Sequence, residues 1–79
     1  MKQTVPDFGA HIRRFREASL LSQGEVAARL GKNQKWLCER ERGKRKMTRP
    51  YYLRARAAIE ELKAEAEIRY EEAKKELLA

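Results

Sequence analysis

The feature that most constrains the fold is a run of helix starts and stops between Ser22 and Gly43. Ser22 and Glu25 have the spacing of a capping box, in which each side chain accepts a hydrogen bond from the other residue's backbone N–H group. Gly31 can then adopt the positive φ that ends a helix without a steric penalty. Asn33 and Gly43 bound a second segment with the same kinds of signal, an N-cap and a terminating glycine. The sequence therefore predicts two short helices joined by a tight turn.

Helical patterns extend to both sides of this pair. A first helix is predicted over about residues 8–18, with Asp7 as its N-cap. The two short helices follow, the first of about eight or nine residues and the second over about residues 34–42. Thr48 then caps a long helix over about residues 50–78, which no internal Gly or Pro interrupts. Because no segment alternates apolar and polar residues as a strand does, we expect an all-α fold.

Positive charge is concentrated in the first part of the chain. The 79 residues include 19 Lys+Arg and 12 Asp+Glu, which gives a net charge of +7. Residues 1–50 contribute +8 to this charge, and residues 51–79 contribute −1. The densest stretch is residues 32–49, where eight basic residues accompany only Glu39 and Glu41. This uneven distribution favours a polyanionic partner.

Size and composition exclude several classes of protein. A chain of 79 residues has room for one small core and no large internal cavity. With one cysteine, Cys38, and one histidine, His11, we expect no internal disulfide, no metal site and no cofactor. We interpret Cys38 as a small hydrophobic residue, in preference to a redox switch. No apolar run approaches the roughly 18–20 residues of a membrane span, and no signal-peptide pattern is present, so we expect a soluble cytoplasmic protein.

Catalysis has no support in the sequence. The chain contains none of the patterns GxxxxGK(S/T), GxGxxG and HExxH, which bind phosphates, dinucleotides and zinc. No serine or cysteine has a histidine and an acidic residue at a suitable spacing for nucleophilic catalysis. We therefore expect a protein that is not an enzyme.

Three stretches, taken in order, resemble one family of DNA-binding proteins. They are Leu21-Ser-Gln-Gly-Glu-Val-Ala-Ala-Arg-Leu-Gly31, Asn33-Gln-Lys-Trp-Leu37 and Glu41-Arg-Gly-Lys-Arg45. Together they resemble the helix-turn-helix of Cro and phage repressors, the XRE-like family, over roughly residues 8–62. The resemblance implies a small all-α helix-turn-helix bundle, and the uninterrupted helical pattern adds a long C-terminal amphipathic helix in place of the family's usual two short helices. Residues 1–62 would bind double-stranded DNA, and residues 63–79 would be an extension for dimerisation or for a protein partner.

The resemblance also implies which side chains contact DNA. Gln23 and Gln34, eleven residues apart, would link a phosphate contact to a base contact, since a glutamine amide can bond adenine N6 and N7 together. Further base contacts are expected from Asn33, Lys35, Trp36 and Glu39. Further phosphate contacts are expected from Arg42, Lys44, Arg45 and Lys46. Arg16 and Glu41 match a structural pair of the family, in which a buried carboxylate is bridged to an arginine of the first helix.

The chain departs from the family pattern at three positions. Lys32 and Arg40 replace apolar residues that usually seal the two short helices together, and Leu20 replaces a common glycine after the first helix. Arg40 could lay its alkyl stem over the core and reach a phosphate. Trp36 has two interpretations: it contacts the DNA groove, or it covers the core in place of the missing apolar side chains.

The long C-terminal helix also has two interpretations. In the first, its N-terminal half packs on the domain and the remainder frays. In the second, a second copy of the chain covers an apolar stripe that comprises Ile59, Leu62, Ala66, Tyr70, Ala73 and Leu77. We favour the homodimer, because an isolated helix has little packing to hold it and because a two-fold symmetric reader gains a second half-site about 34 Å away.

The resulting hypothesis is a sequence-specific DNA-binding transcriptional regulator, a repressor that occupies an operator. It would read the major groove with the helix from about Gln34 to Arg42. The alternative is a protein-interaction, assembly or packaging module, in which the helix-turn-helix is a scaffold that binds nucleic acid without sequence specificity. Affinity for DNA that falls steeply with salt favours the regulator, and capture of a protein partner that is insensitive to salt favours the alternative.

Overall fold

The computed structural model describes residues 7–79, which form four helices with no strand among them. The helices are α1 (Phe8–Ala18), α2 (Gln23–Arg29), α3 (Gln34–Glu41) and α4 (Arg49–Leu78). The all-α prediction, with its long C-terminal helix, is confirmed. The first six residues of the expected domain 1–62 lie outside the described residues. Within residues 7–79, no helix combines the length and the apolar character that crossing a membrane requires.

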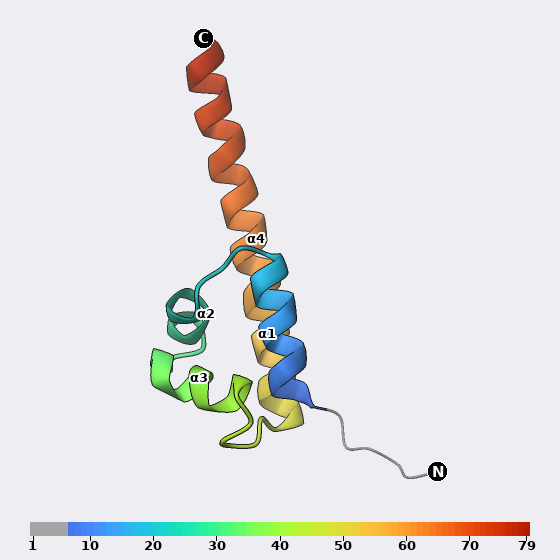
Figure 1. Ribbon diagram of the computed structural model, residues 1–79. Helices are drawn as coiled ribbons and strands as arrows, with labels where there is room; N and C mark the ends of the chain where they lie inside the picture. Colours follow the sequence, from blue (N-terminus) through green and yellow to red (C-terminus); the bar gives the residue numbers. More distant parts are fainter. Residues whose placement is uncertain (1–6) are drawn as a thin grey trace, which may run out of the picture.

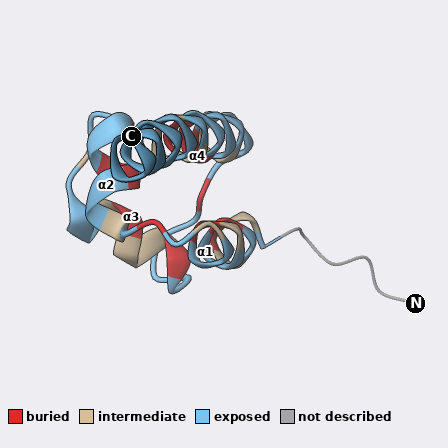
Figure 2. Ribbon diagram, turned by 90° about the horizontal axis from the view of Figure 1, so that it is seen from above, coloured by how far each residue is buried: buried red, intermediate tan, exposed pale blue. Residues whose placement is uncertain are grey.

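The four helices form a small bundle from which one helix projects. α1 lies alongside the first half of α4, and α2 and α3 pack together against one side of this pair (Figure 1). Figure 2 shows the buried residues on the sides of the helices that face one another. The second half of α4 extends beyond the other helices, so the C-terminus lies far from the bundle (Figure 1). The molecule is therefore elongated, with extents of 58 × 30 × 18 Å.

Each helix begins at a side chain that satisfies a free backbone donor. Asp7, Ser22, Asn33 and Thr48 are the N-caps, and each accepts a hydrogen bond from the backbone N–H three residues later, at 2.8–3.5 Å. At α2 the capping box is complete, because the Ser22 backbone N–H also donates to Glu25 Oε1 at 3.0 Å. The hydrogen bond from the Ser22 backbone N–H lowers the pKa of Glu25.

The first three helices all end in the same hydrogen-bonded turn. The residue after the C-cap has a positive φ, and the next N–H donates back to a carbonyl in the last turn of the helix. Gly31 after α2 and Gly43 after α3 adopt this conformation with φ of 73° and 81°. After α1 the same position is held by Leu20, with φ of 60° and a side chain that is 91% exposed. A leucine in this conformation is strained, since its Cβ lies too close to the following carbonyl oxygen.

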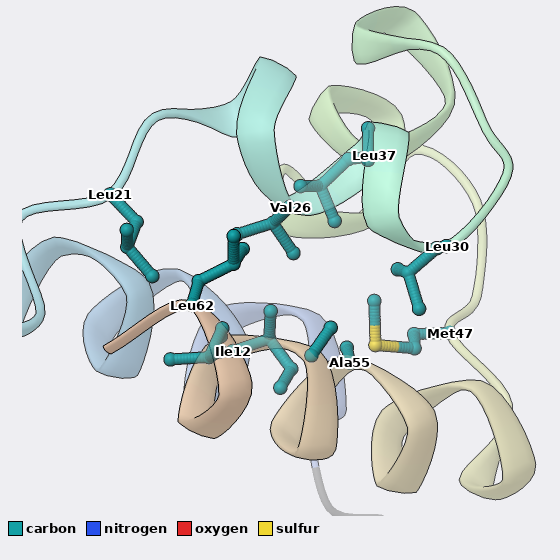
Figure 3. Packing of buried hydrophobic residues seen from close by; sticks show 11 residues of the cluster. Ile12, Leu21, Val26, Leu30, Leu37, Met47, Ala55 and Leu62 are labelled. Carbon is teal, nitrogen blue, oxygen red and sulfur yellow. The ribbon is translucent and has the colours of Figure 1, made fainter. Parts of the chain in front are cut away.

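One hydrophobic core connects all four helices. Its largest fully buried side chains come one from each helix: Ile12, Val26, Leu37 and Ile59. Figure 3 shows these apolar side chains converging between the helices, with Met47 of the α3–α4 loop at one end of the cluster. Because each helix contributes to one core, the position of α3 depends on the packing of all the others.

The core corrects the expected dimer stripe. Ile59 is fully buried and Leu62 is 9% exposed, and both pack inside a single chain against the other helices. They are therefore not available to a second copy. Ala66 is half-buried, and Tyr70, Ala73 and Leu77 are exposed, so only this distal part of the stripe is uncovered.

An ion-pair cluster fastens α2 to α4 just beyond the core. Arg29 donates to Glu61 at 3.1 Å and to both carboxylate oxygens of Glu65 at 2.8 and 2.9 Å. The Arg29 guanidinium lowers the pKa of Glu65. These partly exposed groups hold α4 for about one turn past Leu62, and from residue 67 onwards every residue is exposed.

The strain at Leu20 leads to a testable prediction. Replacing Leu20 by Gly is expected to raise the free energy of unfolding by about 0.5–1 kcal/mol, because relief of about 1–2 kcal/mol of left-handed strain exceeds the extra entropy of an unfolded glycine. Urea unfolding followed by circular dichroism measures the change. Leu20→Ala is the control, because it removes the exposed side chain but keeps a Cβ at positive φ. Equal stability of the two variants would contradict the strain argument.

Candidate nucleic-acid interface

α3 presents one side to the core and the other to solvent. Leu37 and Glu41 are its buried residues, one turn apart. The residues on the opposite side line an open hollow of about 430 Å³. We call these lining residues the α3 face; they are Gln34, Lys35, Cys38, Glu39, Arg42 and Lys44. A helix that is held by one side and free along the other can enter the DNA major groove.

A buried ion pair lies directly behind this face. Arg16 Nε donates to Glu41 Oε2 at 2.8 Å, and Arg16 Nη2 donates to Glu41 Oε1 at 2.9 Å. Arg16 and Glu41 are only 8% and 5% exposed. Arg16 Nη1 also donates to the Leu21 carbonyl at 2.9 Å, so the guanidinium joins α1, the α1–α2 turn and α3. The hydrogen bond to Glu41 raises the pKa of Arg16.

Two glutamines carry this network to the start of α3. Gln23 Nε2 donates to Glu41 Oε1 at 3.0 Å, and Gln34 Nε2 donates to Gln23 Oε1 at 3.3 Å. An ionised carboxylate accepts hydrogen bonds and donates none. The Gln23 amide therefore turns its nitrogen toward Glu41 and its oxygen toward Gln34. Gln34 is exposed and keeps its Oε1 and one N–H free of these bonds. The network therefore sets the orientation of an amide on the α3 face.

The basic residues gather at the C-terminal end of α3 and in the loop that follows. Arg42, Lys44, Arg45 and Lys46 are all exposed. The backbone N–H groups of Lys44 and Arg45 donate to the Glu39 carbonyl at 2.9 and 3.3 Å, which folds the loop back onto α3. The Glu39 carboxylate lies 3.8 Å from Arg45 Nε and is the one acidic side chain on the α3 face. Positive charge therefore borders the surface that α3 presents.

The other expected contact residues lie in different surroundings. Lys35 is exposed on the α3 face. Asn33 is exposed in the α2–α3 turn, where its Oδ1 accepts from the Trp36 N–H at 2.8 Å, and this bond leaves both N–H groups of its amide nitrogen unused. Trp36 is half-buried and packs on the hydrophobic core beside α4 instead of lining the α3 face.

An aromatic and cationic cluster surrounds Trp36. Its ring meets the Tyr51 ring edge-on at 5.0 Å, and the Arg40 guanidinium lies 4.3 Å from the Trp36 ring centre. Lys32 Nζ lies 5.6 Å from the Trp36 ring and 5.3 Å from the Tyr51 ring, and it lowers the pKa of Tyr51. Cation–π contacts of this kind are favourable at partly buried sites. Lys32 and Arg40 therefore cover the junction of α3 and α4 together with the aromatic rings, which favours the structural interpretation of Trp36.

A close helix contact at Gly9 was missed by sequence reasoning. Gly9 of α1 is buried, and a Cβ placed on it would lie 1.9 Å from the Arg40 carbonyl oxygen of α3. Any side chain there would push α3 away from α1. The available signal was a glycine inside a predicted helix, since glycine is unfavourable there unless another backbone approaches closely.

The described residues give little support for a metal site or for a reactive histidine or cysteine. Across residues 7–79, no three His, Cys, Asp or Glu side chains lie close enough together to hold a metal ion. His11 lies on α1 with its Nδ1 2.6 Å from the Tyr52 hydroxyl, and Cys38 is half-buried on the α3 face. The exposed groups of the α3 face are hydrogen-bonding and cationic side chains, which suit nucleic acid.

The buried ion pair yields a prediction about stability. Glu41→Leu is expected to lower the free energy of unfolding by about 3–5 kcal/mol, because it leaves the Arg16 charge buried without a partner. The double variant Arg16→Met with Glu41→Leu is expected to recover most of this loss, since two apolar side chains need no hydration. Urea unfolding of both variants measures the two changes. A single variant that loses under about 1 kcal/mol would show that the pair is dispensable.

Comparison with known proteins agrees with this geometry. A family model described as a helix-turn-helix domain matches residues 7–59, which is more than half of the chain. The match runs from the N-cap of α1 into α4 and includes the whole α3 face. None of the curated proteins and none of the solved structures compared with the chain matches it. Domains of this type are typically non-enzymatic and bind DNA. The chain belongs to the helix-turn-helix domain family.

Proposed function

We propose that this protein is a sequence-specific transcriptional regulator of the Cro and XRE-like type, which represses by occupying an operator. The observation that carries the proposal is the hydrogen-bonded series Arg16–Glu41–Gln23–Gln34, which connects the buried ion pair to an oriented amide on the exposed side of α3. A side chain that is held in one orientation before DNA binds loses less entropy when it contacts a base. A merely charged surface would not need such a network.

Base reading is assigned to the α3 face. The free Oε1 and N–H of Gln34 match the N6 donor and N7 acceptor of adenine. Lys35 would donate to guanine O6 or N7, and Glu39 would accept from cytosine N4. Asn33 would contribute through its amide nitrogen. Trp36 is assigned no base contact, because it packs beside α4.

Phosphate binding is assigned to the rim of the same face. Gln23 would donate a hydrogen bond to a phosphate, and four exposed cations would neutralise phosphate charge: Arg42, Lys44, Arg45 and Lys46. These contacts would fix the orientation of the domain on the DNA backbone. Residues 1–62 would then form the DNA-binding domain and residues 63–79 an extension with a separate role. This division follows the core, which ends at Leu62.

The extension favours a homodimer. The apolar positions 59, 62 and 66 recur eleven residues later at 70, 73 and 77, and an eleven-residue repeat keeps one stripe along a nearly straight helix. The first part of the stripe is covered inside the chain and the second is exposed. A second copy could cover Tyr70, Ala73 and Leu77 by packing the same stripe against them. Two recognition helices would then address two half-sites.

A second candidate function is an assembly or packaging module with non-specific DNA binding. It is favoured by one observation, the exposure of every residue from 67 to 79, which leaves a long surface for a protein partner. Such a module would capture its partner with little dependence on salt and would not discriminate among DNA sequences.

The decisive experiment is selection from a random duplex library with the purified protein at near-physiological salt, followed by sequencing. An enriched inverted repeat is expected, and its spacing would give the distance between half-sites. Tight binding at low salt without enrichment would contradict sequence-specific regulation and favour the packaging module.

Substitutions on the α3 face and in the basic loop are predicted to act differently. Gln34→Ala is expected to cost about 1–3 kcal/mol on the selected sequence and to relax the preference at one base pair. Lys46→Ala is expected to weaken binding to all sequences alike and to reduce the salt slope by about 1. Fluorescence anisotropy on the selected and on single-mismatch duplexes separates the two effects. Unchanged selectivity in Gln34→Ala would remove Gln34 from base reading.

The dimer has a matched test on α4. Ala73→Glu is expected to abolish self-association, because a two-fold interface would bury both new carboxylates. Ala64→Glu places the same charge at another exposed alanine, off the stripe, and is expected to leave association unchanged. Sedimentation velocity at micromolar concentration measures both variants and the parent chain. A monomeric parent, or two variants that behave alike, would contradict this interface.

A further inference from the structure

A second polar hollow lies beside the α3 face, where α1, α2 and α3 meet. It encloses about 210 Å³, and we call it the three-helix cup; its lining comprises Arg13, Arg16, Glu17, Gln23, Cys38, Glu41 and Arg42. Cys38 and Arg42 also line the α3 face, so the two hollows are contiguous. A ligand that follows the surface of α3 would therefore pass over the cup.

The charges at the floor of the cup are already paired with each other. Arg16 and Glu41 bond each other through two atoms each, and Glu41 Oε1 accepts a further hydrogen bond from Gln23. The Gln23 amide nitrogen still has one N–H that none of these bonds uses. The floor therefore offers a hydrogen-bond donor without a competing acceptor.

Two guanidinium groups at the rim supply charge. Arg42 is exposed at the C-cap of α3 and forms no ion pair within residues 7–79. Arg13 is bonded through Nε to Glu17 Oε2 at 3.3 Å, and both side chains are more than half exposed, at 54% and 53%. An exposed pair one helical turn apart is weak and is screened by salt. Arg13 is therefore free to exchange Glu17 for a stronger anionic partner.

We propose that Arg13, Gln23 and Arg42 together bind one phosphate of the DNA backbone in the three-helix cup. This inference rests on the proposed function and extends the interface to α1, which sequence analysis assigned no DNA contact. The two unesterified oxygens of a phosphodiester match two guanidinium groups, which prefer paired acceptors. Gln23 adds its remaining N–H from below. α1 is thereby fixed across the backbone while α3 lies in the groove.

Glu17 has an opposing role in this arrangement. Its carboxylate holds Arg13 in the free protein and lies 4.0 Å from Arg16 Nη2, at the edge of the cup. A phosphate entering the cup would meet this negative charge and would have to displace it from Arg13. Glu17 therefore reduces the affinity for DNA, and its removal would strengthen binding.

Neighbouring arginines of α1 provide a matched test. Arg13→Ala and Arg14→Ala remove the same charge, but Arg14 lines a separate surface with His11, Phe15 and Arg56. Affinity for the selected duplex is measured by fluorescence anisotropy as a function of NaCl concentration, after circular dichroism has shown that each variant is folded. Arg13→Ala is expected to weaken binding severalfold and to reduce the slope of log K against log salt by about 0.9, whereas Arg14→Ala should leave the slope unchanged.

A third variant tests the opposite sign. Glu17→Gln is expected to tighten binding severalfold, and this gain should shrink when Arg13→Ala is also present, because the two residues act through one contact. If the unsubstituted protein binds DNA and the Arg13→Ala and Arg14→Ala variants have equal salt slopes, the cup proposal is overturned and the proposed function is not. A parent chain without salt-dependent DNA binding would overturn the proposed function and the cup proposal with it.

Discussion

The buried bond between Arg16 and Glu41 is the interaction on which the arrangement of this molecule depends. It is made by two charges that are almost completely removed from water, so its geometry must compensate for their lost hydration. It does so through two hydrogen bonds between the charges and a third from the guanidinium to the Leu21 carbonyl. α1, the start of the helix-turn-helix and the end of α3 are thereby joined at one point. Gln23 extends that point to the surface.

α3 is too short to be stable as an isolated helix, so the helices packed against it hold it in place. Its ends are determined by local signals, the Asn33 cap and the turn at Gly43. Its distance from α1 is set by the absence of a side chain at Gly9. Beside α4, the rings of Trp36 and Tyr51 are covered by the cationic side chains of Lys32 and Arg40. The same side chains therefore carry positive charge and complete the packing.

α4 combines two environments in one continuous helix. Its first half supplies Ile59 and Leu62 to the core, and the Arg29 cluster holds the next turn against α2. Beyond that turn nothing in the chain covers the helix within the described residues. The sequence pattern does not change at this boundary, because the eleven-residue repeat continues through it. What changes is the presence of a packing partner, which a repeat in one helix does not specify.

The sequence by itself determined the helices, because caps and terminating residues act within three or four positions along the chain. Ser22 with Glu25, Asn33, Thr48, Gly31 and Gly43 lie where the sequence analysis expected helix ends. The resemblance to repressors predicted roles for Gln23, Gln34, Arg16 and Glu41. Tertiary packing joins these four side chains in one hydrogen-bonded network. Only the tertiary structure shows that Trp36 packs on the core, that Ile59 and Leu62 are buried, and that Arg13 and Arg42 line one hollow. These outcomes depend on contacts between residues distant in the chain, whose free energies are decided by burial and geometry and not by local spacing.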